Sequence, residues 1–274
     1  MEKVLLHTPE GVRDVYGKEC AVKLTIENSI NKVFNIYGYH NIQTPTFEFF
    51  DIFSKERGSV ASKNLYKFFD REGNTLVLRP DVTPSIARLV AKYYMDVKVP
   101  VKLCYNANTY INNSELQGKL KENTQLGCEL INDDSVEADA EILALVVDSL
   151  KAAGLKEFLV EIGHADFYKG LLEECGFDTE NEQELRKRIE NKNYFGVEEI
   201  LDNNNITGQL KEAFLKLPEL FGSIDVIKSA KELTDNKKAL QSIERLEKLY
   251  SILEDYGVSK YISFDLGMIS NFNY

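Results

Sequence analysis

The segment that decides how this sequence is interpreted is TYINNSELQGKLKENTQLGCELI, residues 109–131. It follows a strand-like run, VKLCY (residues 101–105), and it ends in TQLGCELI, whose alternating pattern is typical of a half-buried strand. Between the two runs lies a polar loop with one glycine, Gly118. This layout predicts a β-hairpin of the kind that holds a nucleotide, although the segment contains no arginine.

The composition is that of an acidic globular protein. Of its 274 residues, 43% are hydrophobic, which is ordinary for a chain that buries a core. The formal net charge of −11, from 44 acidic and 33 basic residues, repels polyphosphate, so nucleic acid is not an expected partner. No run approaches about 18 consecutive apolar residues, and the N-terminus has no apolar signal region. We therefore expect a soluble, cytoplasmic protein without a membrane partner.

The cysteines give no indication of a metal site or of a disulfide framework. All four are far apart in the sequence, and none belongs to a CxxC pair: Cys20, Cys104, Cys128 and Cys175. We expect buried thiols in a reducing compartment, with no metal and no cofactor.

Strand and helix patterns predict an α+β fold on a mainly antiparallel sheet flanked by helices. In chain order, the expected segments are a helix at 20–37, a strand at 41–50, two short strands around the turn 71–74, a helix starting at Pro84 behind the cap Thr83, the hairpin, a helix at 135–153 and a strand at 158–163. Residues 166–259 are helical and charge-rich, and a strand returns at 261–267. We expect one core, residues 1–165 and 260–274, interrupted by a helical insertion at 166–259.

Five segments in order resemble the class II catalytic fold of histidyl-tRNA synthetases. They are HTPEGVRDVYGKE (7–19), GYHNIQTPTFE (38–48), LVLRPDVTPSIARLV (76–90), QLGCELI (125–131) and YISFDLGM (261–268). More narrowly, they are similar to the non-synthetase paralogues of that family, the regulatory subunits of ATP phosphoribosyltransferase. The resemblance implies that motif 1, at about residues 20–47 with Gly38 and Pro45, forms a homodimer interface. It also implies that the hairpin is motif 2, which holds ATP in the synthetases.

Motif 2 departs from the synthetase pattern at the positions that bind phosphate. In an alignment without gaps, the arginine for the α-phosphate falls on Ile111 and the following glutamate falls on Asn113. An arginine makes two charge-assisted hydrogen bonds to a phosphate, whereas isoleucine makes none. We therefore expect no adenylate formation and no catalytic residue. Lys119 and Lys121 replace the loop arginines and remain candidates for a weak anion or nucleotide site.

The residues that read histidine in the family are better retained. The resemblance implies a histidine-binding site made of Asp81, Thr83, Gln125 and Glu129, with Gly127 leaving room for the ligand against the backbone. The family's second histidine motif begins with arginine, and Ser270 stands at its place.

Two local alternatives stay open for these four residues. Asp81 and Thr83 are also suited to capping the helix that starts at Pro84. Gln125 and Glu129 are also suited to a solvated sheet face. His40 and His164 have no nucleophile or metal partner in the sequence pattern, and structural roles are expected for both.

The resemblance implies a regulatory subunit that has no synthetase activity. It would assemble with the short-form catalytic subunit of ATP phosphoribosyltransferase, activate it, and relay inhibition by histidine in the first step of histidine biosynthesis. Two other hypotheses remain: a histidyl-tRNA synthetase fragment with an altered motif 2, and a pseudo-synthetase that binds tRNA as a sensor.

Overall fold

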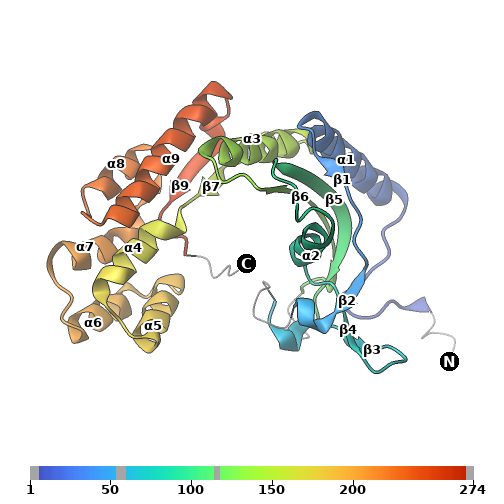
Figure 1. The fold of residues 1–274 in the computed structure, drawn as a ribbon, viewed down its shortest axis with the longest axis horizontal. Coiled ribbons are helices and arrows are strands. Elements are labelled where there is room, and N and C mark those ends of the chain that lie inside the picture. The colour runs from blue at the N-terminus through green and yellow to red at the C-terminus, as the bar shows by residue number, and fades with distance from the viewer. Residues whose placement is uncertain (1–5, 54–59, 114–117, 270–274) are drawn as a thin grey trace. The chain divides into compact units, whose positions relative to one another are not determined.

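The computed structural model describes residues 6–53, 60–113 and 118–269, and these residues form two compact units (Figure 1). The first unit combines residues up to 133 with Asp148–Leu155. The second combines Asp134–Val147 with residues 156–269. Helix α3 (Val136–Ala152) contributes its first turns to the second unit and its last turns to the first.

The larger sheet of the first unit has the order β1-β5-β6. Strand β1 (His40–Asn41) pairs in parallel with β5 (Val101–Tyr110), and β5 pairs antiparallel with β6 (Glu122–Ile131) from Val101↔Ile131 to Tyr110↔Glu122. The hairpin predicted from residues 101–131 is confirmed. Its first strand runs five residues beyond the predicted end at residue 105, because Thr109 and Tyr110 still pair with β6.

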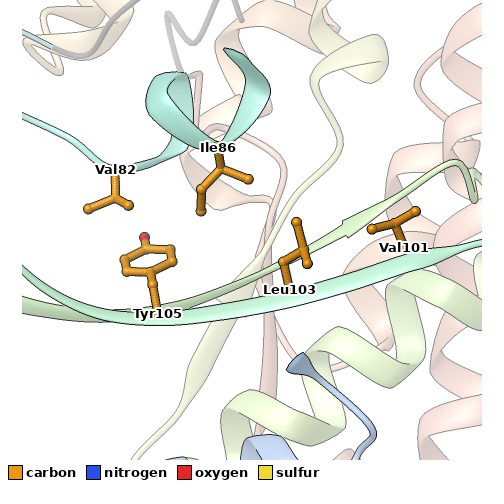
Figure 2. Close-up of a cluster of buried hydrophobic side chains, with 5 residues drawn as sticks. All are labelled: Val82, Ile86, Val101, Leu103 and Tyr105. Atoms are coloured by element: carbon orange, nitrogen blue, oxygen red, sulfur yellow. The ribbon is translucent and has the colours of Figure 1, made fainter. Parts of the chain in front are cut away.

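Helices cover both faces of this hairpin. Helix α1 (Gly17–Ile36) contacts β6, and Lys23 Nζ donates to Thr124 Oγ1 at 2.6 Å. On the other face, helix α2 (Thr83–Tyr93) packs on β5 through a buried apolar cluster. Figure 2 shows this cluster, which consists of Val82, Ile86, Val101, Leu103 and Tyr105, with the Tyr105 ring directed toward Val82.

The start of α2 differs from the expectation. The helix begins at Thr83 rather than at Pro84, and the Thr83 side chain does not cap it. Instead, Asp81 Oδ1 accepts hydrogen bonds from Val82 N at 2.7 Å and Thr83 N at 3.4 Å, so the carboxylate satisfies the first donors of the helix. The Thr83 hydroxyl therefore remains available for another contact.

A second, smaller sheet of the first unit has the order β2-β4-β3, with both pairings antiparallel. Its strands are β2 (Phe47–Phe49), β4 (Thr75–Leu78) and β3 (Lys67–Phe69), with 3-10 turns at η2 (Phe50–Ile52) and η3 (Ser62–Asn64). Arg79 follows β4 and is 6% exposed. Its guanidinium donates to Thr44 O and Asn108 O, each at 2.8 Å, and so holds the chain before β2 against β5.

The second unit surrounds a three-stranded sheet with helices. Strand β9 (Ile262–Asp265) lies between β7 (Val160–Ile162), which is parallel to it, and β8 (Phe221–Gly222), which is antiparallel. The helices are α4 (Ala165–Cys175), α5 (Thr179–Glu190), α6 (Tyr194–Asn203), α7 (Gly208–Lys216), α8 (Asp225–Lys231) and α9 (Lys237–Asp255), with 3-10 turns at η4 (Leu217–Glu219) and η5 (Ser259–Tyr261). The two-residue β8 was not predicted, because the sequence around it is dominated by helical patterns.

The predicted fold class is confirmed, since helices pack on sheets whose pairings are mainly antiparallel. The division at residues 165 and 260 stays a prediction, whereas the compact units join β7 and β9 with the helices that lie between them in the sequence. Within the described part of the chain, no helix combines the length and apolar character needed to cross a membrane.

Candidate functional site

Three of the four predicted histidine-binding residues lie together where α2 begins over β6. Thr83 Oγ1 donates to Glu129 Oε1 at 2.7 Å, and Asp81 contacts Thr83 through the hydrogen bond that caps α2. Asp81 is only 8% exposed. Gln125 lies on the same face of β6 as Glu129, four pairs further along, opposite Ala107. Asp81 thus does cap the helix, and its carboxylate still belongs to a cluster with Thr83 and Glu129.

Tyr105 fills the space that was expected beside Gly127. The two residues are directly opposite each other in the hairpin, and a Cβ on Gly127 would lie 2.4 Å from both Cζ and Oη of Tyr105. The expectation that Gly127 leaves room for a ligand is therefore wrong in this conformation. The glycine instead allows the ring to lie against the β6 backbone. An aromatic residue paired with a glycine across a hairpin was the signal that sequence reasoning missed.

The electrostatics of this cluster favour a cation over an anion. Burial raises the pKa of the Glu129 carboxyl; the hydrogen bond from Thr83 opposes this shift and the nearby Asp81 adds to it. Burial also raises the pKa of Tyr105, and the charges of Glu129 and Asp81 act in the same direction. Two carboxyl groups beside a neutral phenol suit an ammonium group and repel a phosphate.

A polar cavity of about 380 Å³ is lined in part by Val82 and Tyr105, two members of the buried apolar cluster beneath α2. Its remaining lining comes from the chain that enters β2, from Arg79, and from the later part of β5. Because Arg79 is bonded to the backbone of Thr44 and Asn108, it braces the cavity wall.

In the described part of the motif 2 loop, main-chain groups beside the predicted anion site are hydrogen-bonded within the hairpin and to Gly11. Ile111 N donates to Lys121 O at 2.9 Å, so the hairpin ladder continues through the position of the missing arginine. Lys121 N donates to Gly11 O at 2.7 Å. The Lys121 side chain lies close over Gly11, so that a Cβ added at Gly11 would be 2.6 Å from Lys121 Cγ. Lys119 is exposed. Ser270 lies outside the described residues.

His164 has a structural role at the start of α4, where its Nδ1 accepts from Asp166 N at 3.2 Å. Burial lowers the pKa of His164, which keeps the ring neutral and able to accept this hydrogen bond. His164 also lines a cavity of about 810 Å³ between α3, α9 and the end of β7. Arg245 crosses the cavity to Asp139, with Nη2 at 2.6 Å from Oδ2. Sequence patterns did not indicate this cavity.

Comparison with known proteins places these observations in a family. The family model described as histidyl-tRNA synthetase matches residues 11–274. The chain belongs to the histidyl-tRNA synthetase family. Within it, the chain is 46% identical over 274 residues to a Ruminiclostridium cellulolyticum protein and 42% identical over 269 residues to an Acetivibrio thermocellus protein. Both relatives are named ATP phosphoribosyltransferase regulatory subunit, so the resemblance to that branch of the family is confirmed.

The alignment covers nearly all of this chain but only part of its relatives. It includes 100% and 98% of the chain, against 65% and 64% of the two relatives' own lengths. A crystal structure from Bacillus halodurans, titled ATP phosphoribosyltransferase regulatory subunit/histidyl-tRNA synthetase, matches with a TM-score of 0.90 at 36% identity, covering 98% of this chain and 70% of that one. Histidyl-tRNA synthetase from Nostoc sp. PCC 7120 matches with a TM-score of 0.80 at 18% identity, covering 98% of this chain and 63% of that one, which shows the shared fold alone.

Proposed function

We propose that this chain is the synthetase-like part of an ATP phosphoribosyltransferase regulatory subunit that has no synthetase activity. It binds the catalytic subunit, supports its activity, and relays feedback inhibition by histidine. The proposal rests on a contrast between the two halves of the site, the candidate amino-acid pocket and the phosphate-binding loop. The carboxylate cluster of Asp81 and Glu129 is held together by Thr83, while Ile111 occupies the place of the phosphate-binding arginine.

The cluster suits an amino-acid effector because it offers negative charge at a buried position. The ammonium of histidine would replace the Thr83 hydroxyl as the donor to Glu129, and Asp81 would compensate the charge. Gln125 lies on the same side of the hairpin as Glu129 and is only partly buried, so it is the side chain that would face the imidazole. Relay then requires that histidine bind one state of the assembly more tightly than another.

Co-purification tests whether the chain binds the catalytic subunit. We expect this chain and a short-form catalytic subunit to elute together on size exclusion, and histidine to inhibit the joined enzyme more strongly than the catalytic subunit alone. Separate elution together with unchanged histidine sensitivity would refute the proposal.

Calorimetry with histidine tests the effector site. We expect the double variant Asp81→Ala, Glu129→Ala to lose binding, because it removes both buried carboxyl groups. Asp96→Ala, Glu254→Ala removes the same charge at exposed positions and should bind as the unaltered chain does. Equal binding by both double variants would exclude this cluster as the site.

The absence of synthetase activity is tested by histidine-dependent ATP–pyrophosphate exchange. Removal of one transition-state donor typically lowers a rate by about 10²–10³. With Ile111 in place of the arginine, we expect no exchange above background. Exchange at a synthetase-like rate would instead indicate an active synthetase fragment.

We also propose that motif 1, about residues 20–47, forms a homodimer interface, and that the apolar face of the small sheet, which begins at Phe47, belongs to it. Phe47 and Phe49 are 53% and 56% exposed, and they lie opposite Leu78 and Leu76. Phe68 shares this face and contacts Phe47 edge-to-face, with ring centroids 5.9 Å apart. A contiguous apolar patch of this kind is typical of an interaction surface.

Light scattering tests whether two copies of the chain associate through this face. We expect Phe47→Ser, Phe49→Ser to convert a dimer into a monomer. Phe195→Ser removes a 90% exposed ring in the second unit and should leave the dimer intact. A dimer that persists in the double variant would exclude this face.

A further inference from the structure

Two of the cysteines that are distant in the sequence are neighbours in the hairpin. Cys104 of β5 and Cys128 of β6 are directly opposite each other, and both are thiols. Cys104 is 0% exposed, whereas Cys128 is only partly buried. The question is whether the backbone places their sulfur atoms within bonding reach.

The hydrogen bonds around β5 identify the type of pair. Ile42 N donates to Cys104 O at 2.9 Å, so the main-chain groups of Cys104 point toward β1 and away from β6. Ile111 directly follows β5, and its N donates to Lys121 O at 2.9 Å, so the main-chain groups of the odd-numbered residues point toward the partner strand instead. Because the direction alternates along a strand, Cys104 and Cys128 form a non-hydrogen-bonded pair.

This type of pair has the backbone spacing that a disulfide requires. In a non-hydrogen-bonded antiparallel pair the Cα atoms are about 4.5 Å apart and the side chains lie close together on one face. Disulfides span Cα separations of about 4.4–6.8 Å. We propose that Cys104 and Cys128 are a modification site, which a low-molecular-weight disulfide such as oxidised glutathione converts into a cross-strand disulfide.

The reaction proceeds by two thiol–disulfide exchanges. The Cys128 thiolate attacks one sulfur of the glutathione disulfide, which forms a mixed disulfide and releases one reduced glutathione. Cys104 then gives up its proton and attacks the Cys128 sulfur, which releases the second glutathione. The two protein thiols lose two electrons and two protons in total, and one small disulfide is reduced to two thiols.

The order of attack follows from the surroundings of the two residues. Cys104 is buried, and burial raises the pKa of its thiol, so it is a poor first nucleophile toward a reagent in solution. Its Sγ lies 3.5 Å from Asn41 Oδ1. Once Cys128 carries the mixed disulfide, Cys104 is the thiol directly opposite it.

The bond would lie behind the carboxylate cluster. Cys128 stands between Gly127 and Glu129, and Cys104 precedes Tyr105, while their side chains point to the reverse face of the hairpin. Oxidation would therefore fix the register that places Tyr105 opposite Gly127. Formation of the bond does not depend on the proposed function.

Mass spectrometry of the folded full chain tests the proposal. The chain is incubated with graded ratios of oxidised to reduced glutathione, its remaining thiols are alkylated, and it is digested without reduction. We expect a peptide that links Cys104 to Cys128 and is two hydrogen atoms lighter than its reduced parts. Cys128→Ser should yield neither the link nor a glutathione adduct on Cys104, and Cys104→Ala should stop at a glutathione adduct on Cys128. Cys20→Ser and Cys175→Ser serve as controls and should form the link unchanged.

Three results would overturn the proposal. One is a stable glutathione adduct on Cys128 of the unaltered chain with no link to Cys104. Another is a link from either residue to Cys20 or Cys175. The third is that both residues stay reduced at every ratio. Each of these results is obtained on the unaltered chain and does not require any variant to fold.

Discussion

Tyr105 and Gly127 show how a missing methyl group shapes the candidate site. The ring lies so close to the β6 backbone that any side chain at position 127 would collide with it. Tyr105 also belongs to the buried cluster beneath α2, so it cannot move without disturbing that packing (Figure 2). The same ring thus fixes the helix over the hairpin and forms one wall of the carboxylate cluster.

The substitution Gly127→Ala should destabilise the chain by about 1–3 kcal/mol, because it overpacks a tight contact. Its Cβ would lie 2.4 Å from Tyr105 Oη, well inside normal contact distance. Denaturant unfolding measures the loss. In a Tyr105→Ala background the same substitution should cost clearly less, since the colliding ring is gone. Equal costs in the two backgrounds would contradict the contact.

Glu129 should give the stability of the chain a specific pH dependence. Burial raises its pKa above the usual 4.5, so the folded state binds its proton more tightly than the unfolded chain does. Its contribution to stability therefore decreases as pH rises from about 4.5 through the folded pKa, and is constant above it. We expect the unfolding free energy of Glu129→Gln, relative to the unaltered chain, to increase across this window.

Thr83→Val provides the matched comparison for Glu129. It removes the hydroxyl that donates to Glu129 Oε1 and that lowers the carboxyl's pKa. The pH range over which the contribution of Glu129 to stability decreases should then extend to higher pH. A flat difference between Glu129→Gln and the unaltered chain over this range would contradict the raised pKa.

At the scale of elements, the sequence predicts what short-range patterns determine. The alternation in QLGCELI predicts β6, and its register then places Gln125, Gly127 and Glu129 on one face. The bond between Thr83 and Glu129 joins residues 46 positions apart, and no local pattern carries it. Likewise, the Tyr105–Gly127 contact depends on the register of the hairpin, which the polar loop does not specify. The family pattern thus predicts the candidate residues, but it does not predict the contacts among them.

His164 is the N-cap residue of helix α4. His164 Nδ1 accepts from Asp166 N, which only the neutral ring can do. Burial lowers the His164 pKa from 6.5; the charges of Asp166 and Asp139 oppose this shift, while those of Arg245 and Lys169 add to it. The unfolded chain therefore binds more protons, and this contribution to stability is lost as pH falls below about 6.5.

Two substitutions at position 164 separate the cap from the charge. His164→Ala should cost about 0.5–2 kcal/mol at pH above 7, because it removes the side-chain acceptor. His164→Asn keeps an acceptor that does not titrate, so it should retain more of that stability and lose less as pH falls below 6.5. Unfolding free energies at two pH values measure both effects. Equal pH sensitivity of His164→Asn and the unaltered chain would contradict this account.

For the whole molecule, total charge determines which partners approach. With 44 acidic against 33 basic residues, the chain repels nucleic acid unless a local basic patch compensates. Lys119 and Lys121 were predicted as a weak anion or nucleotide site; the Lys121 stem lies over Gly11, and Ile111 stands at the place of the phosphate-binding arginine. This argues against the hypothesis of a tRNA sensor.

A gel shift with labelled tRNA at about 0.15 M salt tests this directly. We expect no retardation of tRNA by this chain, while an intact histidyl-tRNA synthetase in the same gel should retard it. The variant Lys119→Glu, Lys121→Glu should behave as the unaltered chain does, because we expect no nucleic acid to bind at these lysines. A salt-sensitive shift that this variant abolishes would show that the motif 2 loop still binds nucleic acid, and it would revive the sensor hypothesis.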